Sequence, residues 1–214
     1  MADLLSKQSP PRETVWNIPN QLTIARLLLS VVFFVLLALE TPESSSPFIL
    51  NVSLVIFVLA MVTDVLDGYL ARKWKLTSTF GRIADPFADK IVVCGAFVML
   101  TGVAPGLVET WFAVVIIFRE FLVSGLRSFL ESRGVPFGSA WAGKLKMLVQ
   151  SLTIPMIIFY QANLSHIDPD TSSAVTFAYW LTIFLLAATL ILTIASCSSY
   201  IQRAIKLIRE DGVR

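Results

Sequence analysis

Residues 44–72 read SSSPFILNVSLVIFVLAMVTDVLDGYLAR, and this stretch decides the class of fold. It carries no charged residue from Ser44 to Thr63. That length matches the run of about 20 apolar residues that a helix needs to cross the hydrocarbon core of a bilayer. Asp64 and Asp67 follow at the end of the apolar run. The stretch therefore predicts a membrane-spanning helix that ends in an acidic segment.

The composition of the whole chain points the same way. Of its 214 residues, 56% are hydrophobic and 15% are charged, and the mean hydropathy is +0.75. Soluble domains average about 45–50% apolar and about 25% charged residues. A compact soluble fold of this length could not bury so much apolar surface. The composition excludes an ordinary cytosolic enzyme and a disordered chain. The two cysteines, Cys94 and Cys197, exclude a disulfide scaffold because both lie singly in apolar runs.

Proline, glycine and charged residues separate six apolar runs, each long enough to cross a bilayer. We therefore predict an all-α polytopic membrane protein with six transmembrane helices. The runs cover residues 22–39, 47–72, 80–102, 107–131, 141–160 and 172–200. We divide the chain into a polar N-terminal tail (1–16), a six-helix domain (17–200) and a basic C-terminal tail (201–214). Apolar residues alternate with the cations of that last tail, so it either follows an anionic membrane surface or is a frayed helix end.

Lysine and arginine lie on one side of this arrangement. The connections after the first, third and fifth runs hold acidic residues and His166 but neither lysine nor arginine. Cytoplasmic loops of membrane proteins carry an excess of Lys and Arg. The charges therefore predict that both termini are cytoplasmic. Asp64 and Asp67 fall on the same side, so we expect their site to face the cytoplasm.

Four aspartates lie where the second and third runs approach this side: Asp64, Asp67, Asp85 and Asp89. Residues three or four apart share a helix face, so each pair forms a stripe. Because the connection is short, we expect the two helices to be antiparallel neighbours whose stripes face each other. Converging carboxylates repel unless cations lie between them, and oxygen ligands suit Mg²⁺ or Mn²⁺. Two such metals are typical of displacement at phosphorus. The simpler alternative is solvated carboxylates that pair with nearby Arg and Lys side chains.

The pattern D-x2-D-G-x2-A-R-x8-G-x3-D-x3-D, residues 64–89, resembles the signature of the CDP-alcohol phosphotransferases. The resemblance implies a six-helix integral membrane enzyme that moves a phosphatidyl or similar group from a CDP-linked donor to an alcohol and releases CMP. It implies that Asp64, Asp67 and Asp85 are ligands of two metal ions. Asp89 would be the general base and a further ligand.

The same resemblance implies a donor site around the aspartates. Gly68, Ala71 and Gly81 would make room for the cytidine nucleotide, and Arg72 would orient an aspartate or contact the donor. The segment from Asn17 to Arg26 also matches the family, so three of its residues would border the donor site: Asn20, Thr23 and Arg26. For Asn20, a cap of the first helix is an equal alternative.

Cations near the fourth and fifth runs suggest which alcohol is the acceptor. Four of them, Arg119, Arg127, Lys144 and Lys146, can approach one another and suit a phosphorylated acceptor, which carries about two negative charges. The alternative is the ordinary excess of cations at cytoplasmic helix ends. Residues 17–26, 119–127 and 143–146 resemble the branch of the family that makes phosphatidylglycerophosphate. That resemblance implies CDP-diacylglycerol and glycerol 3-phosphate as substrates, and a homodimer.

Three other functions remain open from the sequence. The first is a sister enzyme whose acceptor is inositol phosphate, inositol, serine or phosphatidylglycerol. The second is a membrane prenyltransferase, which also holds a metal diphosphate with aspartates on helices but usually has two well-separated clusters. The third is a divalent-cation transporter, whose carboxylates we would expect at mid-depth rather than near one membrane edge.

Overall fold

The structure, a computed structural model, describes residues 18–42, 44–74, 79–134, 141–168 and 172–211. Those residues form six α-helices and no strand, as the sequence predicts. The helices are α1 (Ile18–Ala38), α2 (Pro47–Trp74), α3 (Thr79–Val103), α4 (Thr110–Ser132), α5 (Trp141–Asn163) and α6 (Ser173–Asp211).

Five of the six helices are long and apolar enough to cross a membrane, which identifies an integral membrane protein. The exception among the described helices is α4, whose 23 residues suffice in length. Its apolar run is interrupted by Arg119, Glu120 and Arg127. Two of these charges, Arg119 and Glu120, are buried inside the protein.

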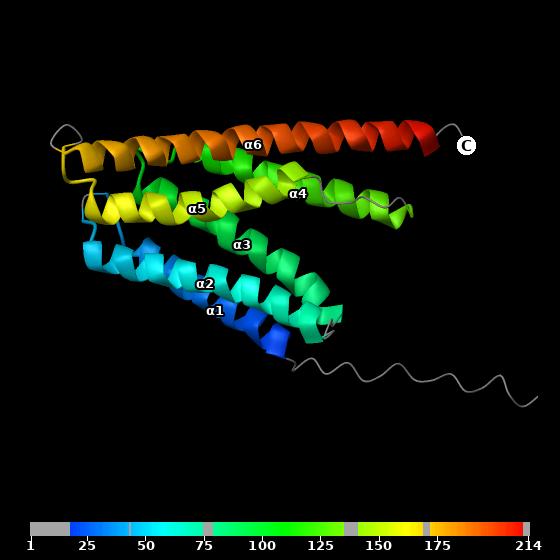
Figure 1. The fold of residues 1–214 in the computed structure, drawn as a ribbon, viewed down its shortest axis with the longest axis horizontal. Coiled ribbons are helices and arrows are strands. Elements are labelled where there is room, and N and C mark those ends of the chain that lie inside the picture. The colour runs from blue at the N-terminus through cyan, green and yellow to red at the C-terminus, as the bar shows by residue number, and fades with distance from the viewer. Residues whose placement is uncertain (1–17, 43, 75–78, 135–140, 169–171, 212–214) are drawn as a thin grey trace, which may run out of the picture.

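Successive helices run in alternating directions along one elongated bundle (Figure 1). As a result, the first residues of α1 and the last residues of α6 lie at the same end. The C-terminal end of α2 and the N-terminal end of α3, which carry the aspartates, lie at that end too. α6 has 39 residues and projects beyond its neighbours there. It continues without a break past Tyr200, so the predicted boundary between domain and tail coincides with no interruption of the helix.

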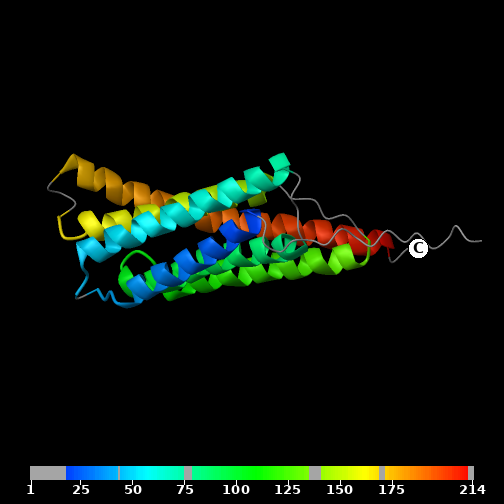
Figure 2. The same cartoon turned by 90° about the horizontal axis from the view of Figure 1, so that it is seen from below.

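α1 lies between α2 and α3 (Figure 2) and packs against both. α2 and α3 run antiparallel, as expected, but within the described ranges they do not pack closely against each other, so the expectation that they are direct neighbours is wrong. Gly95 leaves room for α1 on α3, since a Cβ at this position would collide with the ring of Phe34. α5 closes the bundle by contacting α2, α3 and α6.

The bundle has an aromatic-rich core and an apolar exterior. Phe33 on α1, Phe57 on α2, and Phe97 on α3 are at most 1% exposed, and they belong to one continuous core cluster. Many large apolar side chains point outward instead, among them Phe118, Phe121, Val31, Val65, Trp180, Phe184 and Ile191. So extensive an exposed apolar surface is unusual for a soluble monomer and fits contact with lipid.

Candidate active site

Arg26 of α1 lies at the centre of the aspartates. Its side chain is 2% exposed and forms an ion pair with Asp64 of α2. Its Nη2 atom lies 3.7 Å from Oδ2 of Asp67 and 3.8 Å from Oδ1 of Asp85. One guanidinium from α1 thus joins three carboxylates from α2 and α3. We call these four residues the acidic cluster, because its carboxylates outnumber its cation.

Two other predicted donor-site residues of α1 belong to the same region. Oγ1 of Thr23 donates a 2.6 Å hydrogen bond to Oδ1 of Asp85. Asn20 is 2% exposed and lies within α1, so the alternative that it caps this helix is wrong. These contacts explain how the carboxylates of two helices that do not pack closely come together: α1 supplies the side chains between them.

The acidic cluster suits a hard divalent cation in its chemistry. All its candidate ligands are carboxylate oxygens, the type that Mg²⁺ and Mn²⁺ prefer. Oδ2 of Asp67 is buried and accepts no hydrogen bond, which leaves one ligand atom unsatisfied. In the described part of the chain, however, no three His, Cys, Asp or Glu side chains already converge as a metal site. Arg26 instead holds the space between the carboxylates.

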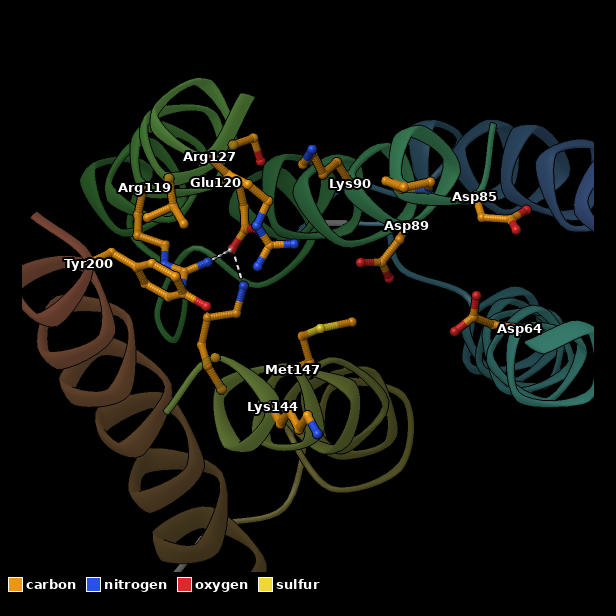
Figure 3. A pocket seen from close by; sticks show the side chains of 15 residues that line it. Asp64, Asp85, Asp89, Lys90, Arg119, Glu120, Arg127, Lys144, Met147 and Tyr200 are labelled. Atoms are coloured by element: carbon orange, nitrogen blue, oxygen red, sulfur yellow. Dashed lines mark hydrogen bonds and ion pairs between the residues drawn. The ribbon is translucent and has the colours of Figure 1, made fainter. Parts of the chain in front are cut away.

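A cavity of about 360 Å³ opens beside this cluster (Figure 3). Three of the four signature aspartates line it: Asp64, Asp85 and Asp89. Asp67 is buried and does not line the cavity. All four cations that the sequence singles out also line it: Arg119, Arg127, Lys144 and Lys146. The fold therefore brings the predicted acidic and basic residues of α2, α3, α4 and α5 to one cavity.

Two of these cations are tied to a buried carboxylate on the opposite side of the cavity. Oε1 of Glu120 lies 3.2 Å from Nη1 of Arg119 and forms an ion pair with Nζ of Lys146 (Figure 3). Nε and Nη2 of Arg119 donate hydrogen bonds of 3.1 and 2.8 Å to Oγ of Ser196 on α6. The guanidinium carbon also lies 5.8 Å from the ring centroid of Tyr200. We call Arg119, Glu120 and Lys146 the basic cluster.

The other predicted residues are less constrained. Lys144 is exposed and Arg127 is half-buried, and both line the cavity. Gly68 lies next to Asp67 on α2 and is half-buried. The remaining donor-site predictions concern Ala71, Arg72 and Gly81. These residues belong to α2 and α3, but the structure describes only their place in the helices.

Sequence analysis did not assign a site role to Glu120, Ser196 or Tyr200, and the structure places all three around Arg119. A signal for Glu120 was present, since a carboxylate in an apolar helix requires a partner and Arg119 precedes it. Ser196 and Tyr200 gave no comparable signal, because serine and tyrosine are ordinary residues of an apolar helix. Their position follows only from the packing of α6 on α4.

Comparisons with known proteins agree with this arrangement. Residues 16–195 match the family model described as CDP-alcohol phosphatidyltransferase. Several similar proteins bear the name CDP-diacylglycerol--glycerol-3-phosphate 3-phosphatidyltransferase. The one from Haemophilus influenzae is 38% identical over 191 residues, covering 88% of this chain and 94% of the relative. The one from Bacillus subtilis is 34% identical over 153 residues, covering 68% and 78%. The one from Rickettsia typhi is 33% identical over 184 residues, covering 86% and 98%.

Proposed function

The chain belongs to the CDP-alcohol phosphatidyltransferase family, and on that basis we propose that it transfers a phosphatidyl group from CDP-diacylglycerol to glycerol 3-phosphate. The products are phosphatidylglycerophosphate and CMP. The named relatives cover most of the chain, which argues against a prenyltransferase and a cation transporter.

One observation carries this function: the cavity that has carboxylates on one side and paired cations on the other. The reaction needs both. Carboxylates can bind metal cations, and those cations can hold the diphosphate of the CDP-linked donor. The phosphate of the acceptor, in contrast, is bound by positively charged side chains. An uncharged alcohol such as inositol would gain little from four cations, so the basic wall favours a phosphorylated acceptor over serine or inositol.

On the donor side, we propose that Asp64, Asp67 and Asp85 hold two divalent ions, Mg²⁺ or Mn²⁺. Bound there, the ions would neutralise the diphosphate of the donor and make CMP a better leaving group. Gly68, Ala71 and Gly81 leave room for the nucleotide in this proposal, and Asn20, Thr23 and Arg72 border it. Arg26 keeps the carboxylates together when their charges are not otherwise balanced, an assignment that its three close carboxylates support.

On the acceptor side, we propose that Asp89 removes the proton from the primary hydroxyl of glycerol 3-phosphate. The hydroxyl oxygen then attacks the phosphorus that carries the diacylglycerol, and the bond to CMP breaks on the opposite side. No covalent enzyme intermediate is required. Asp89 lines the cavity between the acidic and the basic cluster (Figure 3). The acceptor phosphate contacts Arg119, Arg127, Lys144 and Lys146, which also line that cavity.

We also propose that α4 is the sixth transmembrane helix and that both termini are cytoplasmic. Arg119 and Glu120 point inward and pair with each other, so their charges do not face lipid. The positive-inside rule then places the cavity on the cytoplasmic side, where glycerol 3-phosphate is available. A homodimer, which the family resemblance implies, completes the proposal and can be tested by the mass of the purified protein in detergent.

The decisive experiment is an assay of radiolabelled CMP release by purified protein with CDP-diacylglycerol and Mg²⁺. The acceptors are glycerol 3-phosphate, inositol phosphate, inositol, serine and phosphatidylglycerol, each tested separately. We expect release only with glycerol 3-phosphate. Release that depends on another acceptor would overturn the proposed acceptor but not the family. Divalent-metal uptake into liposomes without any lipid product would support the transporter instead.

A further inference from the structure

Three cavities follow one another from the active site toward the outside of the bundle. The cavity of about 360 Å³ shares Asp64, Asp89 and Lys146 with an inner chamber of about 220 Å³. The chamber in turn shares Met61 and Ser151 with a groove of about 410 Å³ between α2 and α5. The shared lining residues show that the three spaces adjoin one another, and we call their succession the path.

The polarity of the walls changes along this path. The first cavity is lined by charged side chains from four helices. The groove is lined almost entirely by apolar ones, among them Val62, Val65 and Leu152, which are 47%, 68% and 53% exposed on the outer surface of the bundle. Such a groove opens toward lipid. A ligand that fills the whole path is ionic at one end and hydrocarbon at the other.

Gln150 of α5 lines the chamber in the middle of the path. Its side chain is 1% exposed, and its Nε2 atom is buried without a hydrogen-bond partner. A buried amide donor left unpaired is costly, so a bound group that accepts its hydrogen bond would be favoured. Gln150 lies one helical turn, about 6 Å, beyond Lys146 and on the same face of α5. The group that it binds is therefore close to, but not at, the phosphate site.

We propose that the chamber binds the ester-bearing glycerol backbone of the diacyl donor, with Gln150 donating a hydrogen bond to an ester carbonyl. The acyl chains then leave through the groove between α2 and α5. This inference rests on the proposed function, because it concerns the same lipid donor. In a diacyl lipid the ester carbonyls lie a few bonds from the phosphorus, between the ionic and the hydrocarbon parts. That order matches the order of walls along the path: charged side chains, an amide donor, and an apolar groove.

The test compares two CDP-linked donors that differ only in the ester carbonyls, a diester and a diether with the same chain length. For the unaltered protein we expect the KM for the diether to be about fivefold higher, the effect of one lost hydrogen bond. For Gln150→Met, which keeps an unbranched side chain but no donor, the KM for the diester should rise about fivefold. The ratio of the KM for the diether to the KM for the diester should then fall to about one in this variant. The KM for glycerol 3-phosphate should stay unchanged.

Gln161→Met provides the matched control, because Gln161 lies on the same helix but outside the three cavities. This variant should keep the unaltered preference for the diester. Equal KM values for both donors in the unaltered protein would overturn the inference without any variant. A Gln150→Met variant that keeps the full preference for the diester over the diether would also overturn the inference. If the unaltered protein turns over neither donor, the proposed function is wrong and the subsite is wrong with it, whereas turnover without discrimination contradicts the subsite alone.

Discussion

The acidic and the basic cluster are built in the same way with opposite charges. In the acidic cluster, the carboxylates of Asp64, Asp67 and Asp85 surround one guanidinium. In the basic cluster, the cations of Arg119 and Lys146 share one carboxylate. Each cluster thus contains a counter-charge that is too small to neutralise it. The two unbalanced sides face one cavity, which suits the binding of cations on one wall and of an anion on the other.

The source of the counter-charge separates the two clusters. Glu120 neighbours Arg119 in the sequence, and the pair lies on one helix. Arg26 comes from α1, far along the chain from the aspartates that it joins. The acidic cluster therefore forms only when α1 is inserted between α2 and α3, whereas two of the three residues of the basic cluster already lie together on α4. Three substitutions examine this contrast.

The largest effect is expected at Asp89, which lies between the two clusters (Figure 3). Asp89→Asn keeps the shape of the side chain but removes the proton acceptor. We expect turnover to fall by about 10²–10⁴-fold, the usual contribution of general-base catalysis. CMP release by purified variant in detergent provides the measurement. Glu131→Gln, an exposed position at the end of α4, is the control and should keep full activity. Near-normal turnover by Asp89→Asn would remove this residue from the mechanism.

The next effect concerns the counter-charge of the acidic cluster. Arg26→Met leaves the carboxylates without their buried cation, and breaking a buried ion pair in this way costs about 3–5 kcal/mol. Mg²⁺ should restore part of that loss, because the ion replaces the missing positive charge. Thermal unfolding with and without Mg²⁺ measures both effects.

Arg133→Met on the exposed end of α4 is the matched control for this measurement. It should change neither the unfolding midpoint nor the response to Mg²⁺. If Mg²⁺ stabilised Arg26→Met no more than the unaltered protein, the acidic cluster would not be a metal-binding group.

The smallest of the three effects concerns the basic cluster. Arg119→Ala removes one of the charged groups that we propose to bind the acceptor phosphate. A hydrogen bond to a charged group is worth about 1.5–3 kcal/mol, or about 10-fold to 100-fold in affinity. The KM for glycerol 3-phosphate should rise by that factor, and more than the KM for CDP-diacylglycerol. Steady-state kinetics with each substrate varied in turn separate the two. Arg133→Ala should leave both constants unchanged. Equal increases in the two constants would mean that Arg119 supports the bundle rather than the acceptor.

The helices could be predicted from the sequence because hydrophobic length and helix breakers are local properties. The six predicted runs correspond one by one to α1–α6. The main error was the direct packing of α2 on α3. Elements that follow each other in the chain are usually neighbours in space, and nothing local signals that α1 comes between them. The role of Arg26 at the centre of the aspartates depends on this packing, so the motif alone could not reveal it.

In the candidate site, too, local properties of the sequence could be recognised, whereas contacts that depend on packing could not. Four aspartates and four cations stood out because charges in apolar helices are rare. Glu120 could have been included on that ground. Gln150 and Ser196 could not, because a single amide or hydroxyl in a helix becomes informative only when its burial and its neighbours are known.

The hydrogen bonds between Arg119 and Ser196 also fix the level of Arg119 along α6. Ser196 lies 23 residues beyond Ser173, the first residue of α6, which corresponds to about 35 Å along the helix axis. The hydrocarbon core is about 30 Å thick. The part of α6 between Ser173 and Ser196 is therefore about as long as a bilayer core is thick, and Arg119 is attached at its far end. The basic cluster thus lies about one bilayer thickness, measured along α6, from the end of the bundle at which this helix begins.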